Sequence, residues 1–250
     1  MNSILIGLGV FATIFGAAEF GIALRKRIPD THLGSEAKDV IRLVTGITAT
    51  TSALVLGMLV SSAKTYYDSW NTQVAETSSQ VVTIDRLLQD YGPETAHIRV
   101  EFAQLVEGGV RRIWPNQDPL QVALKPQDVG EELMHEVELL TPKDNYQVVA
   151  KSQIMPMITA LRQGQWRMYL RTQQTSMPTP LLLIVVSWQA AIFISMGLFA
   201  PQNPTIHATF VLGAMVVSTA VFIILEMYSP FRGILSISSA PISDAIRLIQ

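Results

Sequence analysis

The sequence predicts an all-α, polytopic membrane protein with four transmembrane helices and a helical domain inserted between the second and the third. Two observations favour this fold class. The 250-residue chain is 49% hydrophobic and only 15% charged. Its apolar residues also gather in blocks that are long enough to cross a hydrocarbon core of about 30 Å as helices. The four blocks are Ile4–Leu24, Ile41–Ala63, Leu181–Ala200 and Ile206–Tyr228.

These blocks divide the chain into two hairpins around a polar insert. We expect a first transmembrane hairpin at residues 1–63, an α-helical extramembrane domain at 64–178, a second hairpin at 179–230 and an amphipathic tail at 231–250. The first block is expected to be a retained helix instead of a signal peptide, because its basic residues follow the apolar run.

The insert begins with a heptad pattern that favours packing of helix against helix. Mostly apolar side chains recur at alternating intervals of three and four residues, at Tyr67, Trp70, Val74, Thr77, Val81, Ile84, Leu88 and Tyr91. The pattern stops at Gly92 and Pro93, which are residues that end helices. Further helices are predicted at about 94–114, 128–140 and 144–174.

No proline separates the second membrane block from this heptad pattern. The two segments are therefore predicted to form one continuous helix of about 50 residues, roughly 75 Å long. Such a helix would couple the extramembrane domain to the membrane, which is a property that a channel needs and a simple anchor does not.

The second membrane block has two distinct faces at 100° per residue. One face consists of small residues, which let helix backbones approach closely in lipid: Gly46, Thr50, Ala53, Gly57 and Ser61. The opposite face has hydroxyl groups and a narrow apolar part: Thr45, Thr48, Ser52, Val55, Leu59 and Ser62. We interpret the first face as a helix-packing surface and the second as a candidate pore lining. Hydroxyls that only bond their own helix backbone are the alternative for the second face.

Two acidic residues lie near the ends of membrane blocks, at Glu19 and Glu226. Each is a candidate for a ring of charge at a pore mouth, and the alternative is an interfacial carboxylate that pairs with Arg25 or Arg232. Gln189 lies in the middle of the third block. Because a buried amide requires a hydrogen-bond partner, this helix is expected to face protein.

The sequence contains no catalytic motif and no cofactor-binding motif that would indicate an enzyme. It has no cysteine, which excludes thiolate chemistry and disulfides, and its net charge of −2 does not suggest binding to nucleic acid. Glu131, His135 and Glu138 share one helix face at a spacing that metals can use, but a solvated acidic face is the better interpretation. No metal site is therefore predicted, and the expected partners are further copies of the chain, membrane lipid and ions.

Several stretches resemble one family. They include "GLFAPQN" at Gly197–Asn203, "SPFRGILSIS" at Ser229–Ser238 and "VRRIWPN" at Val110–Asn116. With these stretches the sequence resembles the bestrophin-like proteins of bacterial membranes. The resemblance implies an oligomeric ion channel of the bacterial inner membrane, with four membrane helices in each subunit and the second helix lining the pore. A non-conducting scaffold or sensor, whose insert binds a partner, is the alternative function.

Basic residues suggest an orientation in the membrane. The short loop after the first block contains Arg25, Lys26, Arg27 and Lys38, and Arg42 follows. Because basic residues in short loops favour the cytoplasmic side, this loop is expected inside the cell and the insert outside. That orientation is opposite to the one that the resemblance implies.

Overall fold

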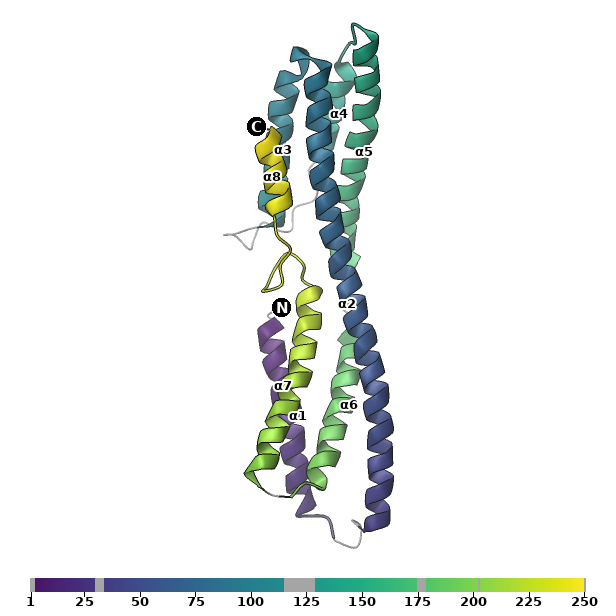
Figure 1. Cartoon of the computed structure of the whole chain (residues 1–250), viewed down its shortest axis with the longest axis vertical. Helices are drawn as coiled ribbons and strands as arrows, with labels where there is room; N and C mark the ends of the chain where they lie inside the picture. The colour runs from purple at the N-terminus through teal and green to yellow at the C-terminus, as the bar shows by residue number, and fades with distance from the viewer. Residues whose placement is uncertain (1–2, 30–33, 115–128, 175–178, 202, 250) are drawn as a thin grey trace. The chain divides into compact units, whose positions relative to one another are not determined.

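The computed structural model describes residues 3–29, 34–114, 129–174, 179–201 and 203–249. The described residues form helices and no strands, as Figure 1 shows, so the predicted all-α class is confirmed. The chain divides into two compact units. Unit 1 comprises Met1–Tyr67 and Met177–Leu235, and unit 2 comprises Asp68–Ser176 and Ser236–Gln250.

Unit 1 contains the apolar helices α1 (Ser3–Arg25), α6 (Thr179–Leu198) and α7 (Pro204–Met227), together with the first part of α2 (Ser35–Tyr91). Each of these four helices is long and apolar enough to cross a membrane, which confirms the four predicted blocks. Side chains of α1, α6 and α7 form most of the core of this unit. Its most deeply buried members include Ile14, Ala18, Val185, Ala214 and Ile224.

The helix α2 is one continuous helix of 57 residues. At 1.5 Å per residue it is about 85 Å long. It begins six residues before the predicted membrane block and ends at Tyr91, as the Gly92–Pro93 pair predicts. A short 3-10 turn, η2 (Pro93–Thr95), follows, and the buried hydroxyl of Thr95 bonds the carbonyl group of Leu88 near the end of α2. The predicted continuity between the membrane block and the heptad pattern is therefore confirmed.

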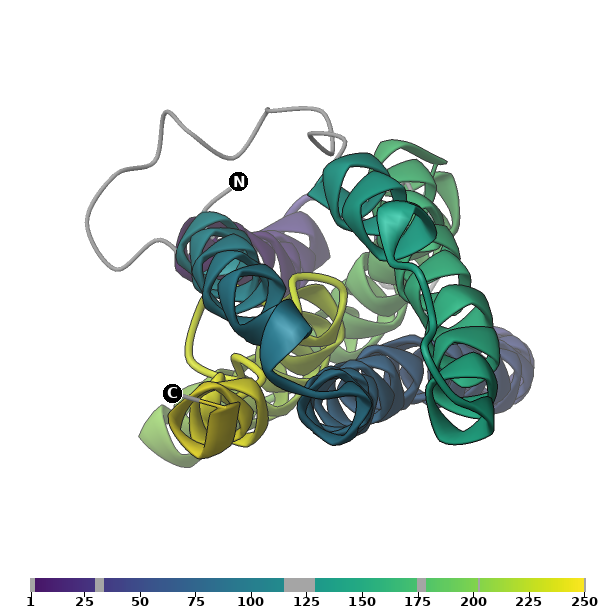
Figure 2. The same ribbon diagram turned by 90° about the horizontal axis from the view of Figure 1, so that it is seen from above.

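Unit 2 is a helical bundle around the C-terminal part of α2. Viewed from above in Figure 2, this part of α2 lies among α3 (Ala96–Ile113), α5 (Asn145–Gln174) and α8 (Ala240–Ile249). The shorter α4 (Val129–Leu139) packs against α5. The heptad side chains of α2 from Trp70 to Tyr91 are all buried, which confirms the predicted packing surface.

The C-terminal tail belongs partly to each unit. Residues 231–235 stay with unit 1, whereas α8 packs against α3 in unit 2. The apolar face of α8 is buried through Ile242, Ala245, Ile246 and Ile249. The indole N–H of Trp114 at the end of α3 also donates a 2.8 Å hydrogen bond to the carbonyl of Ile237. The helix α8 lies within the predicted amphipathic tail, and the division between the two units falls between Leu235 and Ser236.

Candidate functional site

The membrane part of α2 is the least covered of the four apolar helices. Only 11% of its most apolar 18-residue window is buried inside the chain, compared with 33% for α1 and 28% for each of α6 and α7. Because α2 contacts the rest of unit 1 along one side only, its opposite side is open. The two sides correspond to the two faces predicted from the sequence.

Polar side chains join the inner side of α2 to α6. Ser52 has no exposed surface, and its hydroxyl accepts a 3.0 Å hydrogen bond from Nε2 of Gln189. Two helical turns earlier, the hydroxyls of Thr45 and Ser195 are 2.9 Å apart. Hydrogen bonds of this kind hold helices together in lipid, where water cannot replace them. The prediction that Gln189 faces a protein partner is confirmed.

Further contacts extend along the same side of α2. Leu59 is only 3% exposed and belongs to the core of unit 1, and Val55 packs against that core. The hydroxyl of Ser62 lies 3.2 Å from the phenol oxygen of Tyr228, which is the first residue after α7. Thr48 bonds the backbone of its own helix, through the carbonyl of Val44.

At two of its six positions the face predicted to line a pore is therefore a packing face within the chain, and for the other four, which keep exposed surface, pore lining stays a prediction. Ser52 and Leu59 are covered by the chain's own helices, so we reassign these two residues from pore lining to packing. The physical reason is that a hydroxyl can be satisfied equally by pore water and by a side chain on a neighbouring helix. Sequence periodicity separates two faces of a helix and does not say which of them points inward.

The small-residue face, in contrast, is open in the single chain. Gly46, Thr50, Ala53, Gly57 and Ser61 are all exposed, and a Cβ atom built on either glycine would meet nothing within 4 Å. Large exposed side chains lie beside them, at Leu43, Ile47, Leu54 and Met58. We call these nine residues the open face of α2. That this face packs against further copies of the chain stays a prediction.

The closest helix packing in unit 1 lies elsewhere, between α1 and α6. A Cβ on Gly21 would collide with the carbonyl oxygen of Ile194, and a Cβ on Gly197 would collide with that of Ala18. Both glycines are therefore required by the close approach of two backbones. The sequence analysis did not identify this contact, although its signal is present as a glycine inside each apolar block.

Glu19 joins α1 to α7. Its Oε1 lies 2.6 Å from Nδ1 of His207, and both side chains are partly exposed. Helix α6 contains no titratable residue, and the others in α1 and α7 are Arg25 and Glu226. Glu19 thus has a partner on a neighbouring helix, which is the usual arrangement of an ionisable group at membrane depth. Its proposed role at a pore mouth stays a prediction.

Glu226, the second acidic residue considered for a pore mouth, has a structural role. Its side chain is only 3% exposed, and Oε2 accepts hydrogen bonds from the backbone N–H groups of Ile234 at 2.6 Å and Leu235 at 3.2 Å. Gly233, with φ of 90°, lies directly against this carboxylate and leaves no room for a Cβ. A covered carboxylate cannot attract ions to a pore mouth, so we reassign Glu226 to the support of the loop that follows α7.

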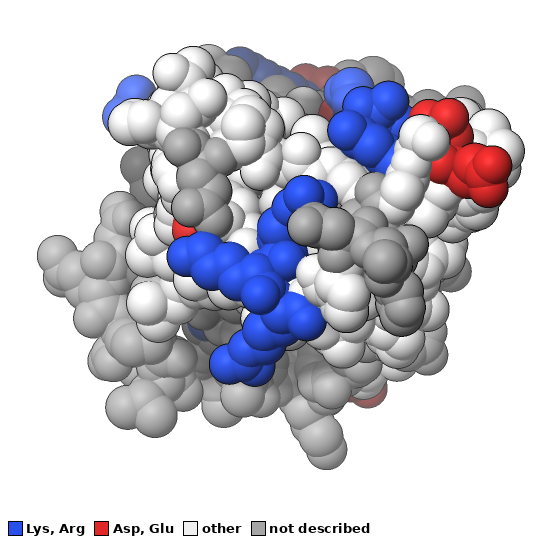
Figure 3. All heavy atoms as spheres, turned by 90° about the horizontal axis from the view of Figure 1, so that it is seen from below, with Lys and Arg blue, Asp and Glu red and all other residues white. Residues whose placement is uncertain are grey.

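One end of unit 1 is basic. Figure 3 shows Lys and Arg side chains across the face where α1 ends and α2 begins. The basic residues of the sequence at this end are Arg25, Lys26, Arg27, Lys38 and Arg42. The ammonium group of Lys38 also lies 5.8 Å from the ring centre of Phe199, which follows α6. This face contains the residues on which the predicted orientation rests.

The charged contacts of unit 2 stabilise the bundle. The carboxylate of Asp85 is fully buried and accepts two hydrogen bonds from Arg99, which raise the pKa of the guanidinium. Lys143 donates to Glu94, and this bond lowers the pKa of Glu94 and raises that of Lys143. Burial raises the pKa of Tyr91 beside them. Such pairs orient neighbouring helices relative to one another.

Three residues of α4 were considered for a metal site. Within the described ranges, no group of three or more His, Asp or Glu side chains is arranged to hold a metal ion. Glu131, His135 and Glu138 lie along α4, and the carbonyl of Glu138 accepts a hydrogen bond from Lys151.

The model of the Bestrophin-like domain family matches residues 12–242, which is nearly the whole chain. No curated protein and no solved structure matches the chain. The match covers α2 to α7 in full, most of α1, the start of α8 and the loop held by Glu226. The chain therefore belongs to the Bestrophin-like family, which includes ion channels.

Proposed function

We propose that this chain is one subunit of a homo-oligomeric ion channel whose copies assemble around the open face of α2. One observation supports the proposal most strongly: α2 is fixed to its own subunit along one side and is uncovered along the other. A helix that lines a pore between subunits requires this division. Membership of a family that includes ion channels supports the same function.

The open face indicates which residues would line the pore. Five exposed residues fall within a narrow strip of α2, directly opposite Ser52 and Leu59. They are Leu43, Thr50, Leu54, Gly57 and Ser61. In a ring of copies this strip would face the axis, with the hydroxyls of Thr50 and Ser61 on either side of Leu54. An apolar ring at Leu54 would act as a constriction that opens by wetting.

The proposal includes a location and partners. The four apolar helices indicate a multi-pass membrane protein, and we place it in the inner membrane of a bacterium. Its partners would be further copies of the chain, lipid and the conducted ions, with no cofactor. The basic face at Arg25–Arg27 would lie in the cytoplasm, because short basic loops are retained there.

Ion flux from liposomes tests this function. We expect Leu54→Ala to widen and wet the constriction, and therefore to increase flux relative to the unsubstituted protein. Leu8→Ala is a matched control, since Leu8 is also a highly exposed leucine and lies on α1, outside α2. We expect its flux to equal that of the unsubstituted protein.

The alternative is a non-conducting scaffold or sensor, and one observation favours it. Leu43, Leu54 and Met58 are large apolar side chains, which suit a lipid-facing surface as well as a constriction. Liposomes of both the unsubstituted protein and Leu54→Ala that remain impermeable to K⁺, Na⁺ and Cl⁻, with the oligomer intact, would favour this alternative. A protein mass of only 27.5 kDa in several mild detergents would reject assembly itself.

A further inference from the structure

The distribution of charge along the chain is uneven at α5. No Asp or Glu occurs between Asp144 and Glu226, and within this stretch α5 contains Lys151, Arg162, Arg167 and Arg171. The helix therefore contributes four positive charges and no negative charge of its own. The helix also leads, after four residues, into the membrane helix α6.

Two of these arginines differ from the other described basic side chains of unit 2. The others each bond an acidic side chain, an amide or a carbonyl group: Arg86, Arg99, Arg111, Lys143, Lys151 and Arg247. Arg162 and Arg167 make no ion pair or hydrogen bond with the described residues. Their charges are therefore available to an anion that comes from outside the chain.

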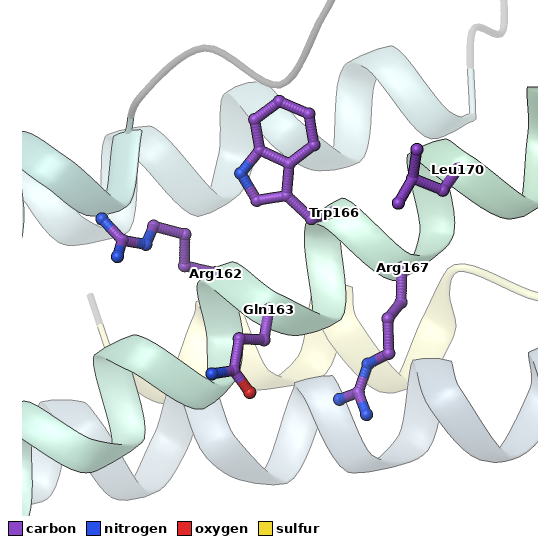
Figure 4. A pocket seen from close by; sticks show the side chains of 5 residues that line it. All are labelled: Arg162, Gln163, Trp166, Arg167 and Leu170. Carbon is purple, nitrogen blue, oxygen red and sulfur yellow. The ribbon is translucent and has the colours of Figure 1, made fainter.

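Apolar side chains accompany these arginines. Trp166 is 41% exposed and Leu170 is 47% exposed, and both line a hollow of about 490 Å³ together with Arg162, Gln163 and Arg167. Figure 4 shows Trp166 and Leu170 on the same side of α5, whereas Arg162 and Arg167 extend away from the indole in different directions. Guanidinium groups that diverge suit several separate anions better than one free phosphate ion.

We infer that this face of α5, formed by Arg162, Trp166, Arg167 and Leu170, binds the anionic lipid headgroups of the membrane that α6 enters. Arginine forms strong bidentate hydrogen bonds with phosphate groups, and juxtamembrane basic residues are attracted to anionic lipid surfaces. Tryptophan and leucine beside them suit the boundary between headgroups and acyl chains. A soluble anion would use the arginines and leave the apolar pair exposed. The inference is independent of ion conduction.

Fluorescence quenching of the full-length protein tests this inference. The protein in neutral detergent micelles is titrated with brominated phosphatidylglycerol, which is anionic, or with brominated phosphatidylcholine, which has no net charge. The signal of Trp166 is obtained by subtracting the signal of Trp166→Phe, since the chain has three other tryptophans. We expect quenching of Trp166 by the anionic lipid at far lower concentrations than by the neutral one.

The arginines are tested in the same titration. Loss of both charges in Arg162→Gln/Arg167→Gln is expected to raise the half-quenching concentration of phosphatidylglycerol by about 30-fold. Arg86→Gln/Arg247→Gln, an equal loss of two charges at arginines that already bond side chains of their own helices, should leave it unchanged. Equal quenching by both lipids, or an unchanged half-quenching concentration in Arg162→Gln/Arg167→Gln, would overturn the inference. Competition by millimolar inorganic phosphate would also overturn it and would indicate a site for a free anion.

Discussion

The amide of Gln189 in α6 donates a 3.0 Å hydrogen bond to the hydroxyl of Ser52 in α2, a side chain with no exposed surface. This bond fixes which side of α2 faces its own subunit. It thereby also determines which side remains available to lipid, to another subunit or to a pore axis. The function proposed for the open face depends on this rotational setting of α2.

Removal of this bond should weaken unit 1. Ser52→Ala leaves the amide of Gln189 without its acceptor in an apolar setting, so we expect a loss of about 0.6–2 kcal/mol in the free energy of unfolding. Unfolding in mixed micelles measures the loss. Ser187→Ala serves as the control, because Ser187 is exposed and bonds only its own helix at Ile184. Equal stabilities of the two variants would contradict the role of the bond.

The α1–α6 contact should tolerate no additional methyl group. Gly197→Ala places a Cβ against the carbonyl oxygen of Ala18, and the required backbone shift should cost about 1–3 kcal/mol. Gly9→Ala, on the exposed side of α1, meets nothing within 4 Å and should be neutral or slightly stabilising. The same micelle unfolding experiment compares them. Two neutral variants would show that α1 and α6 do not approach this closely.

The sequence predicted the helices well, because each has a local signal. The heptad pattern from Trp70 to Tyr91 correctly predicted the buried side of α2 in unit 2. Gly92 and Pro93 correctly predicted where α2 ends. In that segment the apolar face contrasts with a polar one. In the membrane both faces of α2 are apolar or weakly polar, so no such contrast exists and the inner side at Ser52 could not be identified.

Contacts between distant segments were the other part that sequence reasoning missed. Gly233 lies seven residues after Glu226, yet its positive φ and its contact with that carboxylate depend on the three-dimensional path of the loop. His207 meets Glu19 across 188 positions of the chain. Arg25 and Arg232 were considered as partners of the two acids because they are near in sequence, which is a weaker guide than packing.

The contact between Lys143 and Glu94 predicts a pH dependence. The pKa of Glu94 is lowered by this bond, so its contribution to stability is present above about pH 4.3, the value of a free glutamate, and is lost as the pH falls further. The pKa of Lys143 is raised, so the contribution persists up to about pH 10.4 and is lost at higher pH. The stability difference between the unsubstituted protein and Lys143→Met should therefore vanish below and above this window. Lys143 is exposed and Glu94 is only partly buried, so a small difference is expected. A difference that grows below pH 4 would contradict the assignment.

The orientation in the membrane can be tested with cysteines, since the chain has none. Ser35→Cys lies at the start of α2 beside the basic face, and Ser79→Cys lies at an exposed position of α2 in unit 2. We expect an impermeant thiol reagent to label Ser79→Cys and not Ser35→Cys in intact cells. The reverse pattern would place unit 2 in the cytoplasm.

Chemical cross-linking in native membranes tests the assembly around α2 most directly. Gly57→Cys places a thiol on the open face, and Ser52→Cys places one on the side that packs against α6. With a short bifunctional maleimide, Gly57→Cys is predicted to form covalent dimers, because copies of α2 surround a common axis. Ser52→Cys is predicted to stay monomeric, since its thiol is covered within its own subunit. A Gly57→Cys protein that reacts with a single-headed maleimide but never forms dimers would contradict the assembly of copies around this face.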